Sequence, residues 1–508
     1  MELRKYQADA NTAVAVKWKE FSKLLVAMPT GSGKTICFAF MAADELEAGG
    51  RVLVLAHRNE LIKQPVKKLR KAVFIEAAVE RADERAYPHD GVTVGSIQTL
   101  MRQKRLEQFP QDYFSLIIVD ECHHILADSY QRILNYFKTA RVCGFTATPD
   151  RGDKKDLGKY FDALAYEYTL RQAIDDGWLC RIVAKTHPLK IDLSNVRITS
   201  GDFNKDDIST ALDPYLPPIA DAIPLDRKTL IFTPLCATAQ KLQTILREKG
   251  RRAYYASGKD RSQMKAWEND GPGAIMLNAA LLNEGYDQPD IDCVVVLRAT
   301  KSRPYFAQMV GRGTRINPGK KNLLVLDFLW QTTRHDLCHP CSLIAESTEI
   351  AEKMEERQEK AGGEMDLELM EELAKRDVLK EREEALAKQL RDQRHKKSRL
   401  IDPVAYGVMI KNEGLVDYEP VFAWEEQAPS PGQLTLLRRF GINAEKVKTK
   451  GHAKHLLDSI IGRSKKKMAP PGQSRTLSDA GYYTMDMTKT RANELLSELS
   501  SNYWRMKF

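Results

Sequence analysis

Short runs of mostly apolar residues alternate with longer amphipathic segments through the first two thirds of the chain. The runs lie at 24–27, 52–56, 116–119, 229–233, 274–277 and 293–297. Such short apolar runs are typical of strands buried on both faces of a parallel sheet. Segments with helical patterns lie between them, as at 36–46 and 237–249. The alternation predicts an α/β fold with two tandem parallel sheets, one in residues 1–170 and one in 221–335.

A phosphate-binding loop follows the first apolar run and precedes a helical segment. It reads Met28-Pro29-Thr30-Gly31-Ser32-Gly33-Lys34-Thr35, with Met28 where a first glycine is usual. Glycines let successive backbone N–H groups converge on phosphate oxygens, and the helix N-terminus adds the positive end of its dipole. Gly31, Ser32 and Gly33 are therefore expected to cradle a nucleoside triphosphate. Lys34 then contacts its β- and γ-phosphates, and Thr35 binds Mg²⁺.

Two adjacent carboxylates end the apolar run at 116–119. The strand continues as Asp120-Glu121-Cys122-His123. Carboxylates beside a buried strand are costly unless they hold a metal or a reacting water. Asp120 is expected to bind Mg²⁺, and Glu121 to polarise the water that attacks the γ-phosphate. A zinc site at His123 and His124 is the alternative, but a strand of this kind fits phosphate chemistry better.

Polar residues also follow two further strands of the predicted first sheet. His57 and Arg58 come after one strand, and Ser96, Gln98 and Thr99 after another. Ligand groups gather at the carboxyl ends of strands in an open α/β sheet. Hydroxyl and amide groups suit hydrogen bonds to a sugar–phosphate backbone. We therefore expect these residues to contact nucleic acid.

A glutamine stands upstream of the phosphate-binding loop. The side-chain amide of Gln7 offers both a donor and an acceptor, which is what recognition of an adenine edge requires. The alternative is a solvated glutamine at a helix N-terminus.

Two arginines lie three residues apart in the second half. The segment 308–315 opens with Gln308 and contains Arg312 and Arg315. A helical turn would place both guanidinium groups on one face, where they can neutralise charge on a transferring phosphoryl group. A solvated basic turn is the alternative interpretation. Lys301 and Arg303, upstream of this segment, are candidates to hold nucleic-acid phosphates.

These motifs, in this order, resemble the superfamily 2 DExH-type helicases. The likeness rests on Gln7, GSGKT at 31–35, AHRNEL at 56–61, DECH at 120–123 and TATP at 146–149, and it covers roughly residues 1–330. Among these helicases the chain is most similar to the RadD-like and phage-encoded group that shares its motor with type III restriction enzymes. The resemblance implies two RecA-like lobes joined by a connector at 171–220, with ATP and Mg²⁺ as cofactors. It also implies that Gly285 and Asp287 lie near the ribose and phosphates, and that Gln308 belongs to the catalytic set.

A CxxC pair and a charged region follow the predicted second sheet. Cys338 and Cys341 lack a second CxxC, so two idle thiols are favoured over a zinc site, which needs four ligands. Residues 349–398 are dense in Glu, Lys and Arg and are interrupted at Gly362-Gly363. This composition predicts one or two long charged helices within a linker region at 336–427.

The tail at 428–508 contains an internal repeat. Pro431-Gly432-Gln433 and Pro471-Gly472-Gln473 each precede a glycine eight residues on, at Gly441 and Gly481. Each copy is expected to form a helix, a turn with glycine and a second helix. Lysines make the first copy basic, so we expect an auxiliary nucleic-acid contact. Protein docking or a purely structural cap are the alternatives.

Composition sets outer bounds on this interpretation. The 508 residues are 43% hydrophobic and 29% charged, which is typical of globular domains, and no apolar run is long enough to cross a membrane. The eight scattered cysteines favour a reducing compartment, and we expect the cytoplasm of a bacterium or of a phage-infected cell. The net charge of +9 permits an anionic polymer as partner.

The sequence thus predicts an ATP-dependent helicase or translocase that acts on nucleic acid. DNA, single-stranded, duplex or branched, is the expected substrate, with a role in repair or replication, and RNA stays open. One alternative is an ATP-gated clamp that binds DNA or a protein without unwinding. Another is the motor subunit of a restriction complex. That role would need other subunits, because we find no convincing nuclease or methylase motif in this chain. Protein partners are expected through the helical tail.

Overall fold

The computed structural model divides into two compact units. Unit 1 comprises residues 1–375 and unit 2 residues 376–508. The structure describes residues 2–56, 62–88, 91–147, 157–187, 189, 191, 196–199, 202–279, 281–282, 286, 288–328, 338–345, 347–361, 363–393, 400–416, 418–482 and 484–505.

The first lobe of unit 1 is a seven-stranded sheet in the order β3-β4-β2-β5-β6-β1-β7. Every pairing in it is parallel. The strands are β1 (Lys23–Ala27), β2 (Val52–Ala56), β3 (Ala78–Glu80), β4 (Val92–Ser96), β5 (Leu116–Val119), β6 (Arg141–Thr146) and β7 (Ala163–Glu167). Because β1 and β5 end at the same edge of the sheet, the phosphate-binding loop and the paired carboxylates meet there.

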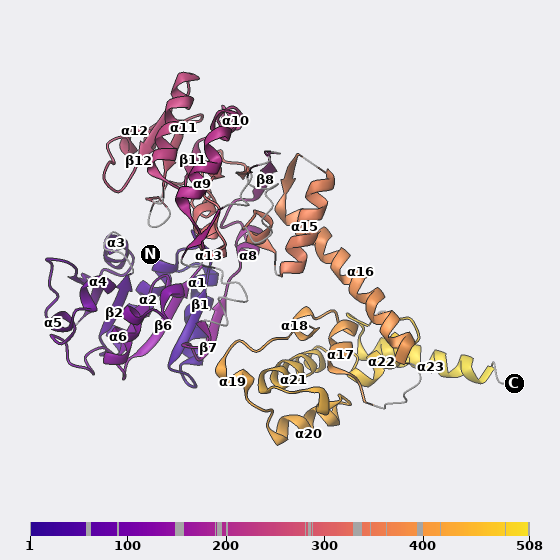
Figure 1. Ribbon diagram of the computed structural model, residues 1–508. Helices are drawn as coiled ribbons and strands as arrows, with labels where there is room; N and C mark the ends of the chain where they lie inside the picture. Colours follow the sequence, from indigo (N-terminus) through magenta and orange to yellow (C-terminus); the bar gives the residue numbers. More distant parts are fainter. Residues whose placement is uncertain are drawn as a thin grey trace. The chain divides into compact units, whose positions relative to one another are not determined.

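Helices accompany this sheet along the chain (Figure 1). They are α1 (Lys5–Lys17), α2 (Lys34–Glu47), α3 (Lys63–Val73), α4 (Ile97–Leu100), α5 (Gln103–Leu106), η2 (Cys122–His124) and α6 (Asp128–Tyr136). The short helix α8 (Leu170–Asp175) follows β7. Among the described residues, no helix is both long enough and apolar enough to cross a membrane.

The second lobe is also a seven-stranded sheet, in the order β12-β13-β11-β14-β15-β8-β16. Only its edge strand β16 is antiparallel to its neighbour. The strands are β8 (Ile182–Thr186), β11 (Thr229–Phe232), β12 (Ala253–Ala256), β13 (Ile275–Asn278), β14 (Cys293–Val296), β15 (Leu323–Asp327) and β16 (Glu364–Asp366). The lobe also contains α11 (Cys236–Glu248), α12 (Met264–Glu268), α13 (Arg303–Val310) and α14 (Cys341–Ile344). The predicted α/β class with two parallel-sheet lobes is therefore confirmed.

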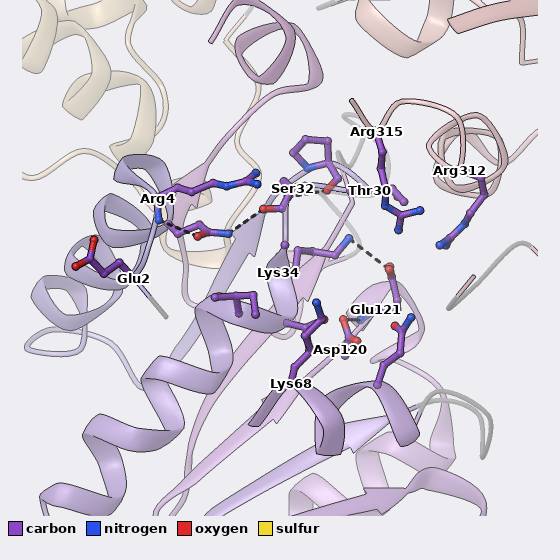
Figure 2. Close-up of a pocket in the computed structure, with 17 residues that line it drawn as sticks. Glu2, Arg4, Thr30, Ser32, Lys34, Lys68, Asp120, Glu121, Arg312 and Arg315 are labelled. Atoms are coloured by element: carbon purple, nitrogen blue, oxygen red, sulfur yellow. Dashed lines mark hydrogen bonds and ion pairs between the residues drawn. The ribbon is translucent and has the colours of Figure 1, made fainter. Parts of the chain in front are cut away.

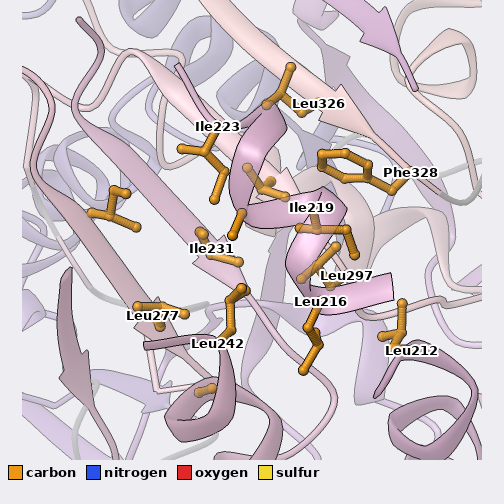
Figure 3. Packing of buried hydrophobic residues seen from close by; sticks show 14 of the residues in the cluster. Leu212, Leu216, Ile219, Ile223, Ile231, Leu242, Leu277, Leu297, Leu326 and Phe328 are labelled. Atoms are coloured by element: carbon orange, nitrogen blue, oxygen red, sulfur yellow. The ribbon is translucent and has the colours of Figure 1, made fainter. Parts of the chain in front are cut away.

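The boundaries of the second lobe differ from the predicted 221–335. Strand β8 and helices α9 (Lys205–Leu212) and α10 (Leu216–Ala222) lie in the expected connector, yet they belong to this lobe. Leu212, Leu216 and Ile219 are buried in its core against Ile231 of β11 (Figure 3). Pro217 and Pro218 stand in the first turn of α10, where a missing backbone N–H costs nothing, so they do not prevent this helix.

Two helices span the charged region. They are α15 (Thr348–Ala361) and α16 (Leu367–Gln393), and the short β16 lies between them. Arg171 of α8 pairs with Glu371 and Glu372 of α16, which ties the start of α16 to the segment that joins the two lobes.

Unit 2 is helical. It contains α17 (Pro403–Met409), α18 (Glu413–Val416), α19 (Ala423–Glu426), α20 (Pro431–Arg439), η4 (Ala444–Lys446), α21 (Lys450–Lys465), α22 (Pro471–Asp479) and α23 (Lys489–Arg505). The pairs α20–α21 and α22–α23 are the two copies of the repeat, each with its own buried cluster. Tyr406 and Leu415, from the predicted linker, are buried in the first cluster, so its packing begins upstream of residue 428.

Candidate functional site

The loop between β1 and α2 adopts the conformation that its glycines allow. Gly31 and Gly33 have φ of +90° and +86°, in the left-handed region that favours glycine, and Gly33 is the N-cap residue of α2. Ser32 Oγ donates to the Pro29 carbonyl at 2.8 Å. Lys34 is buried, and its Nζ donates to the Met28 carbonyl at 3.4 Å. The loop thus forms without a glycine at position 28, because what Met28 contributes to it is a backbone carbonyl, which accepts the hydrogen bond from Lys34.

Gln7 supports this loop from α1. Its Nε2 donates to the Ser32 carbonyl at 3.0 Å, and its Oε1 accepts from the backbone N–H of Arg4 at 3.0 Å. The Tyr6 hydroxyl donates to the same Ser32 carbonyl at 2.6 Å. Gln7 is only 4% exposed, so the solvated glutamine kept as an alternative is not what the structure shows. Sequence alone did not indicate that this amide holds the loop itself.

Glu121 stands at the end of β5 in a strained backbone conformation. Its φ of +50° lies in the left-handed region, which residues other than glycine rarely adopt. Its carboxylate lies 3.3 Å from Lys34 Nζ and accepts from Gln308 Nε2 at 3.3 Å. Burial raises the pKa of Glu121, but the positive charges of Lys34, His123 and Arg312 outweigh it and hold that pKa below its usual value. The carboxylate is therefore ionised at neutral pH and able to orient a water.

Both predicted arginines reach the same cavity from the second lobe. Arg312 and Arg315 follow α13, and each Nη1 donates to the Tyr286 carbonyl, at 3.0 Å and 3.2 Å. They line a cavity of about 340 Å³ together with Lys34 and Glu121. Figure 2 shows both guanidinium groups directed toward the side of the cavity that holds these two residues. The alternative interpretation, a basic turn exposed to solvent, does not hold for Arg312, which is only 5% exposed.

The two lobes touch at this cavity. A Cβ added at Gly311 would lie 2.6 Å from the Cβ of Thr30, so only glycine permits this approach to the phosphate-binding loop. A Cβ at Gly31 would lie 3.5 Å from Thr314 Oγ1 and 3.6 Å from Arg315 Cγ. The seam between the lobes is therefore closed around the site.

Lys320 holds the arginine-bearing loop and was missed by sequence reasoning. Its Nζ donates to the carbonyls of Arg315 at 2.8 Å and of Gly313, and to those of Ile291 at 2.5 Å and Pro289 at 3.3 Å. Burial lowers the pKa of this ammonium below the usual value. A lysine after a Pro-Gly turn carries no pattern that distinguishes it from a solvated one.

Four further cavity residues were also missed. Glu2, Arg4, Gln64 and Lys68 line the cavity beside the phosphate-binding loop. Arg4 lies with its guanidinium carbon 4.2 Å from the centre of the Trp178 ring. For Arg4, the sequence offered one signal of a place near the site, which is its position three residues, or about one helical turn, before Gln7.

The expected nucleic-acid contacts require correction at Ser96 and Thr99. Ser96 is fully buried and is the N-cap of α4, where it accepts from the Thr99 backbone N–H at 3.3 Å. Thr99 is 4% exposed and accepts a hydrogen bond from the Ala82 N–H at 3.0 Å. Their hydroxyls therefore serve the fold of the lobe rather than a phosphate. Gln98, between them, is exposed.

Other expected residues are placed differently or lie outside the described ranges. Arg303 Nη2 donates to the Ala345 carbonyl at 3.0 Å, which ties α13 to the end of α14. Lys301 lies with Nζ 5.2 Å from the centre of the Phe203 ring. The remaining predicted site residues, which are His57, Arg58, Gly285 and Asp287, lie outside the described residues.

The residues present fit Mg²⁺. Thr35 and Asp120 line the same cavity, so a hydroxyl and a carboxylate converge beside the loop. Within the described ranges, no group of three or more His, Cys, Asp or Glu side chains forms a metal cage. Mg²⁺ does not need such a cage, because it takes one or two protein ligands together with phosphates and waters.

Of the CxxC pair, Cys341 is buried, and its thiol contacts Gln358 Oε1 at 3.6 Å.

Comparison with known protein families gives two matches. Residues 1–151 match the family described as "Type III restriction enzyme, res subunit", and residues 219–317 match "Helicase conserved C-terminal domain". These two segments carry, respectively, the phosphate-binding loop with the carboxylates and the arginine pair.

Individual relatives point the same way. "Putative ATP-dependent helicase IRC3" of Saccharomyces cerevisiae is 32% identical over 64% of this chain and 51% of its own length. "Type I restriction enzyme EcoAI endonuclease subunit" of Escherichia coli is 27% identical over 64% of this chain and 46% of its own. The chain thus spans about half the length of these relatives.

Two solved structures share the fold. A fragment of a putative HsdR subunit of a type I restriction enzyme from Vibrio vulnificus YJ016 superposes with a TM-score of 0.52 at 24% identity, over 64% of both chains. The ATP-dependent Type ISP restriction-modification enzyme LlaBIII bound to DNA gives a TM-score of 0.51 at 14% identity, over 97% of this chain and 41% of that one. At these identities the two structures support the fold alone. The two family matches, the helicase relative and the ordered motifs show that the chain belongs to the superfamily 2 helicases, a family of ATP-dependent enzymes.

Proposed function

We propose that the protein hydrolyses ATP in the cavity between its two lobes and uses the cycle to move along nucleic acid, DNA in the first instance. One observation carries the proposal: Lys34 and Glu121 of the first lobe share a cavity with Arg312 and Arg315 of the second. A nucleotide bound there touches both lobes, so its presence or loss changes how they are held together.

In this mechanism the phosphates take over contacts that the protein now makes with itself. Lys34 exchanges Glu121 for the β- and γ-phosphates, which frees the carboxylate to orient the attacking water. Arg312 and Arg315 exchange the Tyr286 carbonyl for the γ-phosphate, where they neutralise charge in the transition state. Thr35 and Asp120 would hold Mg²⁺, which when bound offsets the charge of the phosphate oxygens.

Loss of the γ-phosphate then returns the arginines to Tyr286 and weakens the link between the lobes. A strand of nucleic acid that lies across both lobes would be advanced by repetition of this cycle. The exposed Gln98 is a candidate contact for that strand. Support for DNA comes from the similarity to subunits named as parts of type I restriction enzymes.

A second candidate function is the motor subunit of a restriction complex. It is favoured by the similarity to type I restriction subunits, of which this chain spans less than half in the EcoAI case. In that role the cleavage and modification chemistry would come from other chains. A bacterial or phage-infected cytoplasm is part of the proposal, although one relative is named as mitochondrial.

The test measures ATP turnover and strand displacement by the full chain on single-stranded, duplex and forked DNA and on RNA. We expect DNA-stimulated hydrolysis coupled to displacement of a labelled strand. Lys34→Ala is the site control and should lose both activities with its thermal stability retained. Stimulated hydrolysis without displacement or translocation would favour an ATP-gated clamp, and unchanged turnover in Lys34→Ala would refute the nucleotide site.

A further inference from the structure

The two copies of the tail repeat share one structural frame. Gly441 and Gly481, which follow the first helix of each copy, have φ of +80° and +86°. Leu437 and Leu477, four residues before these glycines, are both fully buried. In the second helices, Ala453 and Ala492 are fully buried as well. These matching positions align the copies with an offset of 40 residues in the first helix and 39 in the second.

Their surfaces differ sharply in charge. Residues 431–467 contain ten lysines and arginines against two acidic residues, whereas 471–505 contain four of each. Arg438 and Arg439 of the first copy correspond to Ser478 and Asp479 of the second. Lys454 on the second helix corresponds to Asn493. Because the second copy folds without these cations, the fold does not require them.

Most of the cations in the first copy form no ion pair with the part of the chain that the structure describes. Arg463 donates to the carbonyls of Met485 and Thr484, and Lys446 pairs with Asp402. Six others are exposed and form no ion pair with any described residue; they are Arg438, Arg439, Lys448, Lys465, Lys466 and Lys467. Cations in a last helical turn can stabilise the helix dipole by about 0.3–1 kcal/mol. However, the equivalent helix of the second copy, α22, ends with Ser478 and Asp479 and forms without such cations. Stabilisation of the helix dipole therefore does not explain why the first copy carries more cations than the second.

We propose that the first copy, α20–α21, binds the phosphate backbone of nucleic acid and that the second copy does not. The cations span both ends of α21, which is 16 residues and therefore roughly 24 Å long. That length matches several successive backbone phosphates of a duplex, which carries one charge per about 1.7 Å of axis. Neutralisation of phosphates releases counterions, so this surface contributes affinity without sequence preference. The proposal rests on the proposed function only in taking nucleic acid as the substrate.

The experiment measures fluorescence anisotropy of labelled duplex and single-stranded oligonucleotides with the full chain, without ATP, from about 50 to about 300 mM KCl. One variant gives the first copy the residues of the second: Arg438→Ser, Arg439→Asp and Lys454→Asn. The control changes three cations of the second copy and is matched to the same net change of four charges: Arg475→Ala, Lys489→Ala and Arg491→Asp. Circular dichroism and thermal unfolding verify that both variants fold.

We expect the first-copy variant to bind duplex at least about tenfold more weakly, with a salt slope smaller by about two to three. The second-copy variant should bind within about twofold of the wild type. Equal losses in the two variants, or wild-type binding by the first-copy variant, would overturn the proposal. So would binding of the first copy to anionic vesicles in place of DNA. ATP turnover without nucleic acid should be unchanged in both variants, so a failure of the motor proposal is seen separately as absent turnover in the wild type.

Discussion

Replacement of Lys320 by methionine tests whether the arginine pair is held in place by the ammonium beneath it. Methionine keeps an unbranched chain of similar length but offers no donor. The substitution leaves four carbonyls, of Pro289, Ile291, Gly313 and Arg315, without their shared partner. Any observed effect therefore reports the loss of these hydrogen bonds more than a change of volume.

The expected cost follows from those contacts. Hydrogen bonds from a charged donor contribute about 1.5–3 kcal/mol each, and an ammonium has three protons to donate. Release of the partly buried ammonium from its desolvation penalty offsets part of the loss. We expect a net destabilisation of about 2–4 kcal/mol. Displacement of the loop by about 1 Å would move the guanidinium of Arg315 and lower kcat by up to about 10²-fold.

The assays are urea unfolding, steady-state ATP hydrolysis and amide hydrogen exchange over residues 309–316. Lys321→Met is the matched control, because that neighbouring side chain is exposed, and it should behave as the wild type. In an Arg315→Ala background, Lys320→Met should cause little further loss of kcat, because both changes act through the same group. Wild-type kcat and unchanged exchange in Lys320→Met would refute the reasoning, whereas a full additional loss in the Arg315→Ala background would show a purely structural role.

Three further predictions concern single groups. Glu121→Gln should bind ATP but lower kcat by about 10²–10⁴-fold, measured by equilibrium binding and single-turnover hydrolysis, and normal turnover would assign activation of the water to another group. Gly311→Ala should raise KM for ATP because its Cβ would push the lobes apart, whereas Gly258→Ala, with nothing within 4 Å, should not; equal KM values would contradict the closed seam. His339 is buried, which opposes its charge, but Asp327 at 2.8 Å outweighs this and raises its pKa above 6.5. The pair therefore contributes stability that is fully present below about pH 6.5 and is lost as the pH rises through the folded-state pKa of His339. The destabilisation caused by His339→Gln, measured by urea unfolding, should therefore shrink with rising pH. A difference in unfolding free energy that does not depend on pH would refute the charged pair.

The central strands and the cavity were predictable because both depend on local patterns. A strand buried on both faces must be apolar along its length, and the carboxyl ends of parallel strands meet at one edge. Lys34, Glu121 and Arg312 therefore came together from three separate motifs. The order of the motifs along the chain supported the resemblance to a known helicase family, which no single motif would have supported.

The features that were missed depend on long-range packing or on backbone contacts. The segment of β8 reads as a strand, but its half-buried positions gave no sign that it pairs with β15 of the second sheet and does not belong to a connector. Strand β16 is only three residues long, so it does not stand out as an apolar run. Ser96 is the last residue of β4, a position suited to ligand binding, but its hydroxyl caps the next helix instead. Lys320 binds only carbonyl oxygens, which every residue has, so no side-chain pattern could indicate its role.

The most direct test of the mechanism is a structure of the full chain with a non-hydrolysable ATP analogue and Mg²⁺. We predict the γ-phosphate within about 3 Å of Lys34 Nζ and of at least one guanidinium of Arg312 or Arg315, with that guanidinium released from the Tyr286 carbonyl. A bound analogue whose γ-phosphate contacts the first lobe alone, with both arginines still on Tyr286, would contradict the claim that the nucleotide joins the two lobes.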